Sequence, residues 1–251
     1  MTVPPLLAAL AFFPGLAVGS FLNVVAARVP ERRSVVRPRS ACGSCGRTIA
    51  WYDNIPLLSY ALLRGRCRGC RARIGLVYPL VEAVAAALIA ACVYRFGLTP
   101  TALVEAVFCA TLVTVSVTDL QRRVIPNPIV LPAAAVVLAG MTLAHPSPQW
   151  AVAAAGASAF LLVFALAVPG GMGMGDVKLA LLMGAALGRT TPVALMVGLL
   201  AALVPSLVLF ARHGRGARKM KIPFGPALAV GAVVALFGGH EILAWYWSIG
   251  G

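Results

Sequence analysis

The chain is organised around a stretch near its middle, Gly171-Met172-Gly173-Met174-Gly175-Asp176-Val177-Lys178. Long apolar runs flank this stretch on both sides, which puts the Asp176 carboxylate at or near membrane depth. A carboxylate there costs roughly 2.5–3.5 kcal/mol on insertion scales, so its presence favours a functional site. Gly173 and Gly175 carry no Cβ, so backbone or substrate can approach closely. The same stretch also fits a plain turn in which Asp176 caps the next helix.

The composition is that of a membrane protein. Of 251 residues, 61% are hydrophobic and 11% are charged, whereas soluble domains carry roughly 25% charged residues. Several apolar runs approach the length of about 20 residues that crosses a bilayer. We therefore predict an all-α polytopic membrane protein with about eight transmembrane helices, the first of them retained rather than cleaved as a signal. The helices are expected over residues 4–27, 79–94, 100–118, 129–144, 150–168, 177–187, 192–211 and 223–247.

The basic residues are distributed unevenly over the predicted loops. With eight crossings, every Lys and Arg except Arg95 and Arg189 falls on one side, which makes 19 of 21 (21 − 2). Lys and Arg collect in cytoplasmic loops, so this side is expected to be cytoplasmic and both termini to lie outside. The net charge of +14 is therefore expected to serve orientation and contact with anionic lipids.

Two of the seven acids are expected at similar depth near the cytoplasmic face. Asp119 ends the 100–118 helix and Asp176 follows the 150–168 helix, although 57 positions separate them (176 − 119). Two carboxylates that meet in a partly desolvated site cannot easily both ionise, so the pair holds one shared proton. One carboxylate then activates water while the protonated partner polarises a carbonyl, as in aspartic peptide hydrolysis. Two unrelated helix-end acids that face the interface fit the same spacing.

Other polar residues of the predicted helices have structural interpretations. Asn23 is expected to join helices by a hydrogen bond. Glu82 is expected to bond within the bundle or to pair with a loop arginine, and Glu105, nearer the outer end of its helix, to face water. The three histidines fall outside or in a basic loop, which does not favour a histidine-based site in the membrane.

Four cysteines form two C-x-x-C pairs in the predicted cytoplasmic loop, namely Cys42, Cys45, Cys67 and Cys70. The 21 residues between the pairs (67 − 45 − 1) are one more than the usual range for a four-cysteine zinc site. Each pair offers two thiolates from one tight knuckle, and two knuckles complete a tetrahedron. A reducing cytoplasm argues against disulfides. We predict a structural zinc ion that folds a loop with little apolar core; a redox pair or unmetallated thiols are the alternatives.

Taken together, the motifs resemble those of the bacterial prepilin peptidases, also called type IV leader peptidases, of the GxGD aspartic protease class. The resemblance covers nearly the whole chain and rests on an ordered set of motifs. These are Gly19-Ser20-Phe21-Leu22-Asn23, the two cysteine pairs, Tyr78-Pro79-Leu80-Val81-Glu82, Asp119 with Ile125-Pro126-Asn127, and Gly173-Met174-Gly175-Asp176-Val177-Lys178. The resemblance implies that Asp119 and Asp176 are catalytic and that Asn127, Gly173, Gly175 and Lys178 support them.

The resemblance also implies an activity and its setting. Such enzymes cut the short basic leader from type IV prepilin-like precursors at the cytoplasmic face of the bacterial cytoplasmic membrane. Many members also methylate the new N-terminus with S-adenosylmethionine, an activity usually attributed to the form with four loop cysteines. No residues for binding S-adenosylmethionine are recognisable in the sequence. We accordingly predict a first transmembrane helix (1–27), a cytoplasmic zinc-binding loop domain (28–78) and a seven-helix catalytic core (79–251).

Two other classes of protein fit part of the pattern. A transporter with a helix broken at Asp176 and a regulatory zinc loop would have its binding site at the break, but the glycine motif has no convincing repeat in the sequence. A membrane anchor that binds nucleic acid through the loop arginines would bind in a salt-dependent manner. The expected partners are prepilins or pseudopilins and membrane lipids, without nucleic acid.

Overall fold

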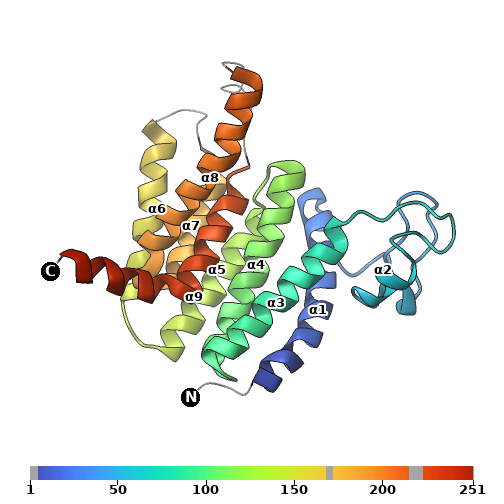
Figure 1. Ribbon diagram of the computed structural model, residues 1–251, viewed down its shortest axis with the longest axis horizontal. Helices are drawn as coiled ribbons and strands as arrows, with labels where there is room; N and C mark the ends of the chain where they lie inside the picture. Colours follow the sequence, from blue (N-terminus) through green and yellow to red (C-terminus); the bar gives the residue numbers. More distant parts are fainter. Residues whose placement is uncertain (1–4, 168–171, 215–222, 251) are drawn as a thin grey trace. The chain divides into compact units, whose positions relative to one another are not determined.

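The computed structural model consists of helices whose bounds lie close to the predicted ones (Figure 1). It describes residues 5–167, 172–214 and 223–250. Within these ranges there is no β-strand, only isolated bridges. The α-helices are α1 (Pro5–Arg28), α2 (Leu58–Leu62), α3 (Val77–Phe96), α4 (Pro100–Arg122), α5 (Asn127–Ala144), α6 (Gln149–Ala167), α7 (Met174–Leu187), α8 (Thr191–His213) and α9 (Gly225–Gly250), with 3-10 turns η1 (Val29–Glu31), η2 (Trp51–Asn54) and η3 (Gly188–Thr190).

Seven of the described segments are long and apolar enough to cross a membrane. One of them, Met174–Arg212, has 39 residues. A straight helix of that length would reach about 58 Å, nearly twice the ~30 Å hydrocarbon thickness of a bilayer. The chain breaks inside it at Gly188, which ends α7 with a φ of +53°. This segment therefore holds two of the eight predicted helices, and the all-α multi-pass fold is confirmed.

The chain forms two compact units, Met1–Val117 and Thr118–Gly251. The boundary falls inside α4, so this helix contributes to both units. All four loop cysteines belong to the first unit, and Asp119 and Asp176 both belong to the second. The predicted division into a first helix (1–27), a loop domain (28–78) and a catalytic core (79–251) concerns the roles of these segments and stays a prediction.

In the first unit, α1 and α3 form an antiparallel pair held by residues spaced four apart. A Cβ on Gly15 or Gly19 would stand 2.8 or 2.7 Å from a Cα atom of α3. One turn further, the Asn23 side-chain amide donates to the Tyr78 carbonyl over 3.1 Å. Small residues let membrane helices approach closely. The prediction that Asn23 joins two helices is thus confirmed.

The expectation that Glu105 faces water is wrong, because this residue is buried. Its side chain is 2% exposed, and its Oε2 atom has no hydrogen-bond partner. Phe108, Cys109 and Leu112 on the same helix are also buried. These positions follow the i, i+3, i+4, i+7 period of one helix face. Glu105 therefore belongs to the inward face of α4.

In the second unit, α6 and α7 are antiparallel neighbours, as are α8 and α9 (Figure 1). Gly184 of α7 leaves no room for a Cβ against the Ala153 backbone of α6. Gly188 lies under the Trp150 ring, and Gly231 of α9 lies against the backbone of α8. These close crossings hold α7 against α6 and α9 against α8, and the site is built from the first turns of α7 and α9.

Candidate active site and metal centre

Asp119 lies in the last turn of α4 and is only 6% exposed. Its Oδ2 atom accepts the N–H of Gly225, the first residue of α9, over 2.8 Å. A Cβ at position 225 would stand 2.9 Å from the same oxygen, so a glycine lets the start of α9 come this close. The N-terminus of a helix carries partial positive charge, which stabilises an ionised carboxylate. The start of α9 therefore orients the Asp119 carboxylate.

Asp176 lies in the first turn of α7 and is 8% exposed. Its Oδ2 atom accepts the N–H of Gly173 over 3.2 Å. This bond caps α7 at its start, which is why the helix begins at Met174 and not at the predicted Val177. The capping interpretation thus describes a real hydrogen bond. It is compatible with a functional role, because the cap holds the carboxylate in one orientation at the positive end of the helix.

The two carboxylates lie close enough to interact electrostatically. The segments that carry them meet where Gly175 packs on Ile125, in the connection between α4 and α5. A Cβ on Gly175 would stand 2.7 Å from the Ile125 Cβ. This contact brings together the segments that carry Asp119 and Asp176, although the two residues are far apart along the chain. The role of the two acids in catalysis stays a prediction.

The remaining supporting residues lie around the start of α7. The Lys178 ammonium donates to the Asn127 Oδ1 atom over 2.8 Å, which ties α7 to the start of α5. Gly173 is less constrained than Gly175, because the nearest atom to a Cβ there would be an Asp176 oxygen at 3.4 Å, an ordinary contact distance. Gly171, which the sequence motif also includes, lies outside the described residues.

Gly225 is the site residue that sequence reasoning missed. It stands in Pro223-Phe224-Gly225-Pro226, just where α9 begins. Proline at the start of a helix is common because its missing N–H is not needed there. Glycine is also an accepted residue at a helix start, so no signal in the sequence was specific to a close approach of Asp119.

The four loop cysteines form one cluster. The Sγ atoms of Cys42, Cys45, Cys67 and Cys70 all lie within 4.8 Å of one another. Four thiolates at about 2.3 Å around a tetrahedral ion stand about 3.8 Å apart. The Sγ atoms of Cys42 and Cys70 are 3.8 Å apart. The cluster therefore fits a metal ion, and because four sulfurs fill a tetrahedral shell, the ion would be structural.

The two knuckles of the cluster repeat one backbone pattern. Cys42 and Cys67 each donate their N–H to the carbonyl five residues later, over 2.9 Å. The pKa of the Cys42 thiol is lowered to about 6 because the backbone N–H groups of Cys45 and Ser44, and the Cys67 thiol, donate to its sulfur. The thiolate is the form that binds metal. The backbone donors of this knuckle thus favour the thiolate form of Cys42.

Comparison with known proteins identifies the family of the chain. The model described as "Bacterial Peptidase A24 N-terminal domain" matches residues 13–96, and the model described as "Type IV leader peptidase family" matches residues 106–211. The chain is 36% identical over 248 residues to the prepilin leader peptidase/N-methyltransferase of Bacillus subtilis (strain 168), covering 94% of this chain and 96% of that relative. The chain belongs to the type IV leader peptidase family.

Other members of the type IV leader peptidase family match over similar lengths. The prepilin leader peptidase/N-methyltransferase of Burkholderia pseudomallei (strain 1026b) is 35% identical over 280 residues, with 97% of this chain and 88% of the relative covered. The protein of the same name from Aeromonas salmonicida (strain A449) is 34% identical over 283 residues, with 98% and 96% covered. No solved structure matches the chain. Membership of a peptidase family favours the peptidase interpretation over a transporter or a nucleic-acid anchor.

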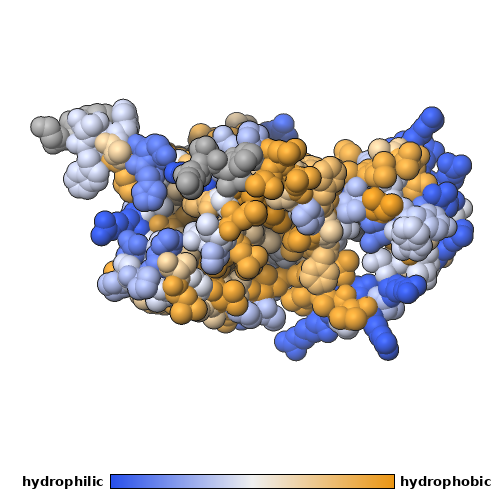
Figure 2. Space-filling model, turned by 90° about the horizontal axis from the view of Figure 1, so that it is seen from below, coloured by the Kyte–Doolittle hydropathy of each residue, from blue (hydrophilic) through white to orange (hydrophobic). Residues whose placement is uncertain are grey.

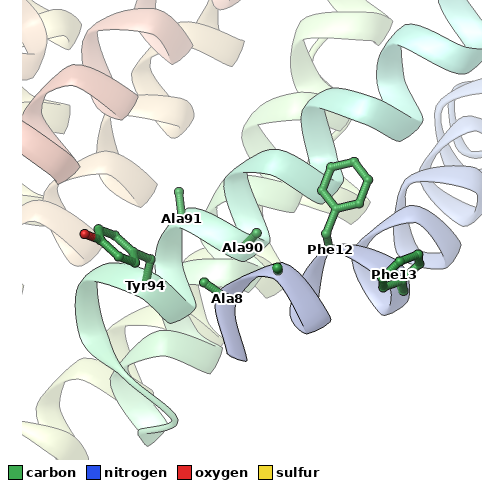
Figure 3. A pocket seen from close by; sticks show the side chains of 7 residues that line it. Ala8, Phe12, Phe13, Ala90, Ala91 and Tyr94 are labelled. Carbon is green, nitrogen blue, oxygen red and sulfur yellow. The ribbon is translucent and has the colours of Figure 1, made fainter. Parts of the chain in front are cut away.

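The names of these relatives raise the question of where a methyl donor would bind. A groove of about 560 Å³ lies between α1 and α3 (Figure 3). A charged sulfonium nucleoside needs placed polar partners, whereas this groove is almost entirely apolar and lies on two membrane-spanning helices. The groove therefore does not fit S-adenosylmethionine, and no residue is assigned to that cofactor. The lining residues are Ala8, Ala9, Phe12, Phe13, Ala90, Ala91 and Tyr94.

Proposed function

We propose that this chain is a membrane aspartic endopeptidase. It cleaves the leader peptide of type IV prepilin-like precursors at the cytoplasmic face of the bacterial cytoplasmic membrane and methylates the new N-terminus with S-adenosylmethionine. The main support is the pair of buried carboxylates, Asp119 and Asp176. Both fall inside the segment, 106–211, that matches the leader peptidase family, and each is held by a backbone N–H at the start of a helix.

The chemistry follows from two carboxylates that share one proton. The ionised carboxylate takes a proton from water as the water oxygen attacks the scissile carbonyl carbon. The protonated carboxyl donates a hydrogen bond to the carbonyl oxygen and stabilises the charge that develops there. The tetrahedral intermediate then breaks at its C–N bond, and the leaving nitrogen takes a proton from the dyad. No covalent bond to the enzyme forms.

The proposal is tested by replacing each acid with its amide and following a co-expressed prepilin by gel shift. In Asp119→Asn and Asp176→Asn the side-chain oxygen can still accept the N–H of Gly225 or Gly173, so the helix starts are preserved. Processing should stop in both variants. Glu31→Gln, which removes an exposed loop carboxylate, is the matched control and should cleave. Persistent processing by either purified variant of the pair rejects the dyad.

Zinc is the ion we propose for the four-cysteine cluster, because soft thiolates in a tetrahedral set suit it. When bound, it supplies folding energy to the loop and holds the two knuckles together. Metal analysis of the purified protein should find one zinc ion per chain, and the content should fall to background in Cys42→Ser/Cys67→Ser. Cys92→Ser, which changes a buried cysteine of α3, should leave it unchanged. Unaltered zinc content in the double variant rejects the site.

Orientation and methyl transfer have separate tests. A cysteine introduced by Val36→Cys, at a loop residue that is 77% exposed, should add labelling by a membrane-impermeant maleimide, beyond that of the native cysteines, in inverted vesicles and not in intact cells. The opposite pattern would place the loop outside.

Mass spectrometry of the mature pilin N-terminus should show one added methyl group. An unmethylated N-terminus after normal cleavage would confine the function to the peptidase.

A further inference from the structure

The zinc-binding loop exposes large apolar side chains that the peptidase site does not use. Trp51 in η2 is 81% exposed, and Leu58 and Leu62 in α2 are 53% and 73% exposed. Leu58 and Leu62 are one helical turn apart, so they share a face of α2. Leu76, which precedes α3, is 73% exposed. Apolar groups in such density, rimmed by charge, mark an interaction surface.

A hydrogen bond to a candidate membrane helix places α2 near the start of that helix. The Leu57 N–H donates to the Glu82 Oε2 atom over 2.9 Å. Glu82 is on α3, five residues after Val77, where a candidate membrane span begins. Side chains lean toward the N-terminus of their helix, so this carboxylate reaches back toward the end of the span. Leu57 has a φ of +58°, which is rare for leucine. The turn into α2 is thus bonded near the start of a candidate membrane span.

Other contacts tie η2 to both α2 and a cysteine knuckle. The Ser59 hydroxyl of α2 donates to the Tyr52 carbonyl over 2.7 Å. Arg68, inside the second C-x-x-C pair, donates two hydrogen bonds of 2.9 and 2.7 Å to the Asp53 Oδ1 atom and lies 5.5 Å from the centre of the Tyr52 ring. These contacts link η2 to α2 on one side and to the second cysteine knuckle on the other.

The charge of the loop shows what kind of partner this surface suits. Residues 28–78 contain 11 arginines and two acids, a net charge of +9 (11 − 2). Both acids already pair with arginines, Glu31 with Arg33 and Asp53 with Arg68. Figure 2 shows apolar side chains among hydrophilic ones at the right-hand end, where Figure 1 places α2. Basic residues beside apolar ones are attracted to anionic headgroups.

We propose that the exposed apolar side chains of Trp51, Leu58, Leu62 and Leu76 insert into the headgroup region of an anionic bilayer and hold the metal loop on the membrane. A bilayer is favoured as the occupant because α2 is bonded to the end of a membrane span, and because Trp and Tyr prefer the interface. The proposal rests on the multi-pass fold and not on the peptidase activity.

The experiment uses the full-length protein in nanodiscs of phosphatidylcholine and phosphatidylglycerol. Trp150→Phe, Trp245→Phe and Trp247→Phe leave Trp51 as the single tryptophan. Its emission should shift to the blue, and lipids brominated near the headgroup should quench it more than lipids brominated near the chain end. The quenching should weaken in nanodiscs of phosphatidylcholine alone. Emission typical of a water-exposed tryptophan, without quenching by either lipid, overturns the proposal.

Two variants separate insertion from a general loss of loop structure. Leu58→Ser/Leu62→Ser should lose most of the quenching while zinc content stays at the wild-type level. Val36→Ser changes an equally exposed apolar residue of the loop that lies away from α2 in the chain, and it should quench like the parent. Equal quenching in the Leu58→Ser/Leu62→Ser variant and its parent would show that α2 does not insert.

Discussion

Replacing Gly175 by alanine should slow the peptidase by displacing one aspartate from the other. The new methyl carbon would stand 2.7 Å from the Ile125 Cβ, whereas ordinary contacts begin at 3.4 Å, so the two segments must part by at least 0.7 Å (3.4 − 2.7). The Ile125 Cβ cannot rotate away, because it is bonded directly to the backbone. The α4–α5 connection, with Asp119 just before it, therefore moves away from α7 and Asp176.

The magnitude follows from the size of this displacement. Misplacing a reacting group by about 1 Å can cost on the order of 10²-fold in rate. Overpacking costs about 1–3 kcal/mol of stability, and the better helix propensity of alanine offsets up to about 1 kcal/mol of it. We therefore expect the Gly175→Ala cleavage rate to fall roughly 10²-fold in a protein that is still folded.

Gly173→Ala is the matched control from the same motif. Its Cβ would meet an Asp176 oxygen at 3.4 Å and nothing closer, and the backbone at φ −82° and ψ 145° suits any residue. The backbone N–H of residue 173 remains and still donates to the Asp176 carboxylate, so cleavage should stay near the wild-type rate. Both variants are assayed on a purified prepilin, with thermal unfolding measured alongside. Wild-type cleavage by Gly175→Ala, or equal losses in both variants, would refute the reasoning.

Three further outcomes are expected. Gly225→Ala should slow single-turnover cleavage at least tenfold, since a charge-assisted hydrogen bond of about 1.5–3 kcal/mol is lost or displaced; an unchanged rate would show that this bond does not orient the dyad. Lys178→Met should lower the free energy of unfolding by about 0.5–1.5 kcal/mol, and Asn127→Ala should add nothing to it in the double variant; additive losses would contradict the bond between them. Arg68 holds the pKa of Asp53 below its usual range through a hydrogen bond. The ion pair therefore contributes fully to the stability of the loop above the unfolded pKa of about 3.9. This contribution is lost as the pH falls through the pKa of Asp53 in the folded protein, which is lower. Asp53→Asn should therefore open the loop to limited proteolysis at neutral pH, and the difference from wild type should vanish at a pH below the folded pKa.

The membrane helices and the metal cluster were predictable from residue patterns alone. A bilayer forces each spanning segment to satisfy its own backbone, so the length of an apolar run is nearly sufficient to find a helix. Two C-x-x-C pairs likewise fix four sulfur ligands through short local turns. For Asp119 and Asp176, charge topology gave a common depth, and the structure brings their carboxylates within electrostatic reach.

The contacts that orient the site were not predictable in this way. The partner of Asp119 is a backbone N–H 106 positions away, and no local pattern says which helix start will face a given acid. The start of α7 was placed too late because the cap from Asp176 to Gly173 was not counted as part of the helix. The exposure of Glu105 was predicted from its distance to a helix end. Its spacing from Phe108 and Cys109 places all three residues on one buried face of α4.

The register of α6 against α7 sets the depth at which a substrate would be cut. Gly184 of α7 faces Ala153 of α6, so Asp176, eight residues before Gly184, stands level with Leu161, eight residues after Ala153. Helix α6 continues six residues beyond that level, to Ala167, which is about 9 Å of helix. Asp176 therefore lies about 9 Å short of the end of α6. In the reaction proposed above, the leader and the hydrolytic water would meet at this depth and not at the end of the helix.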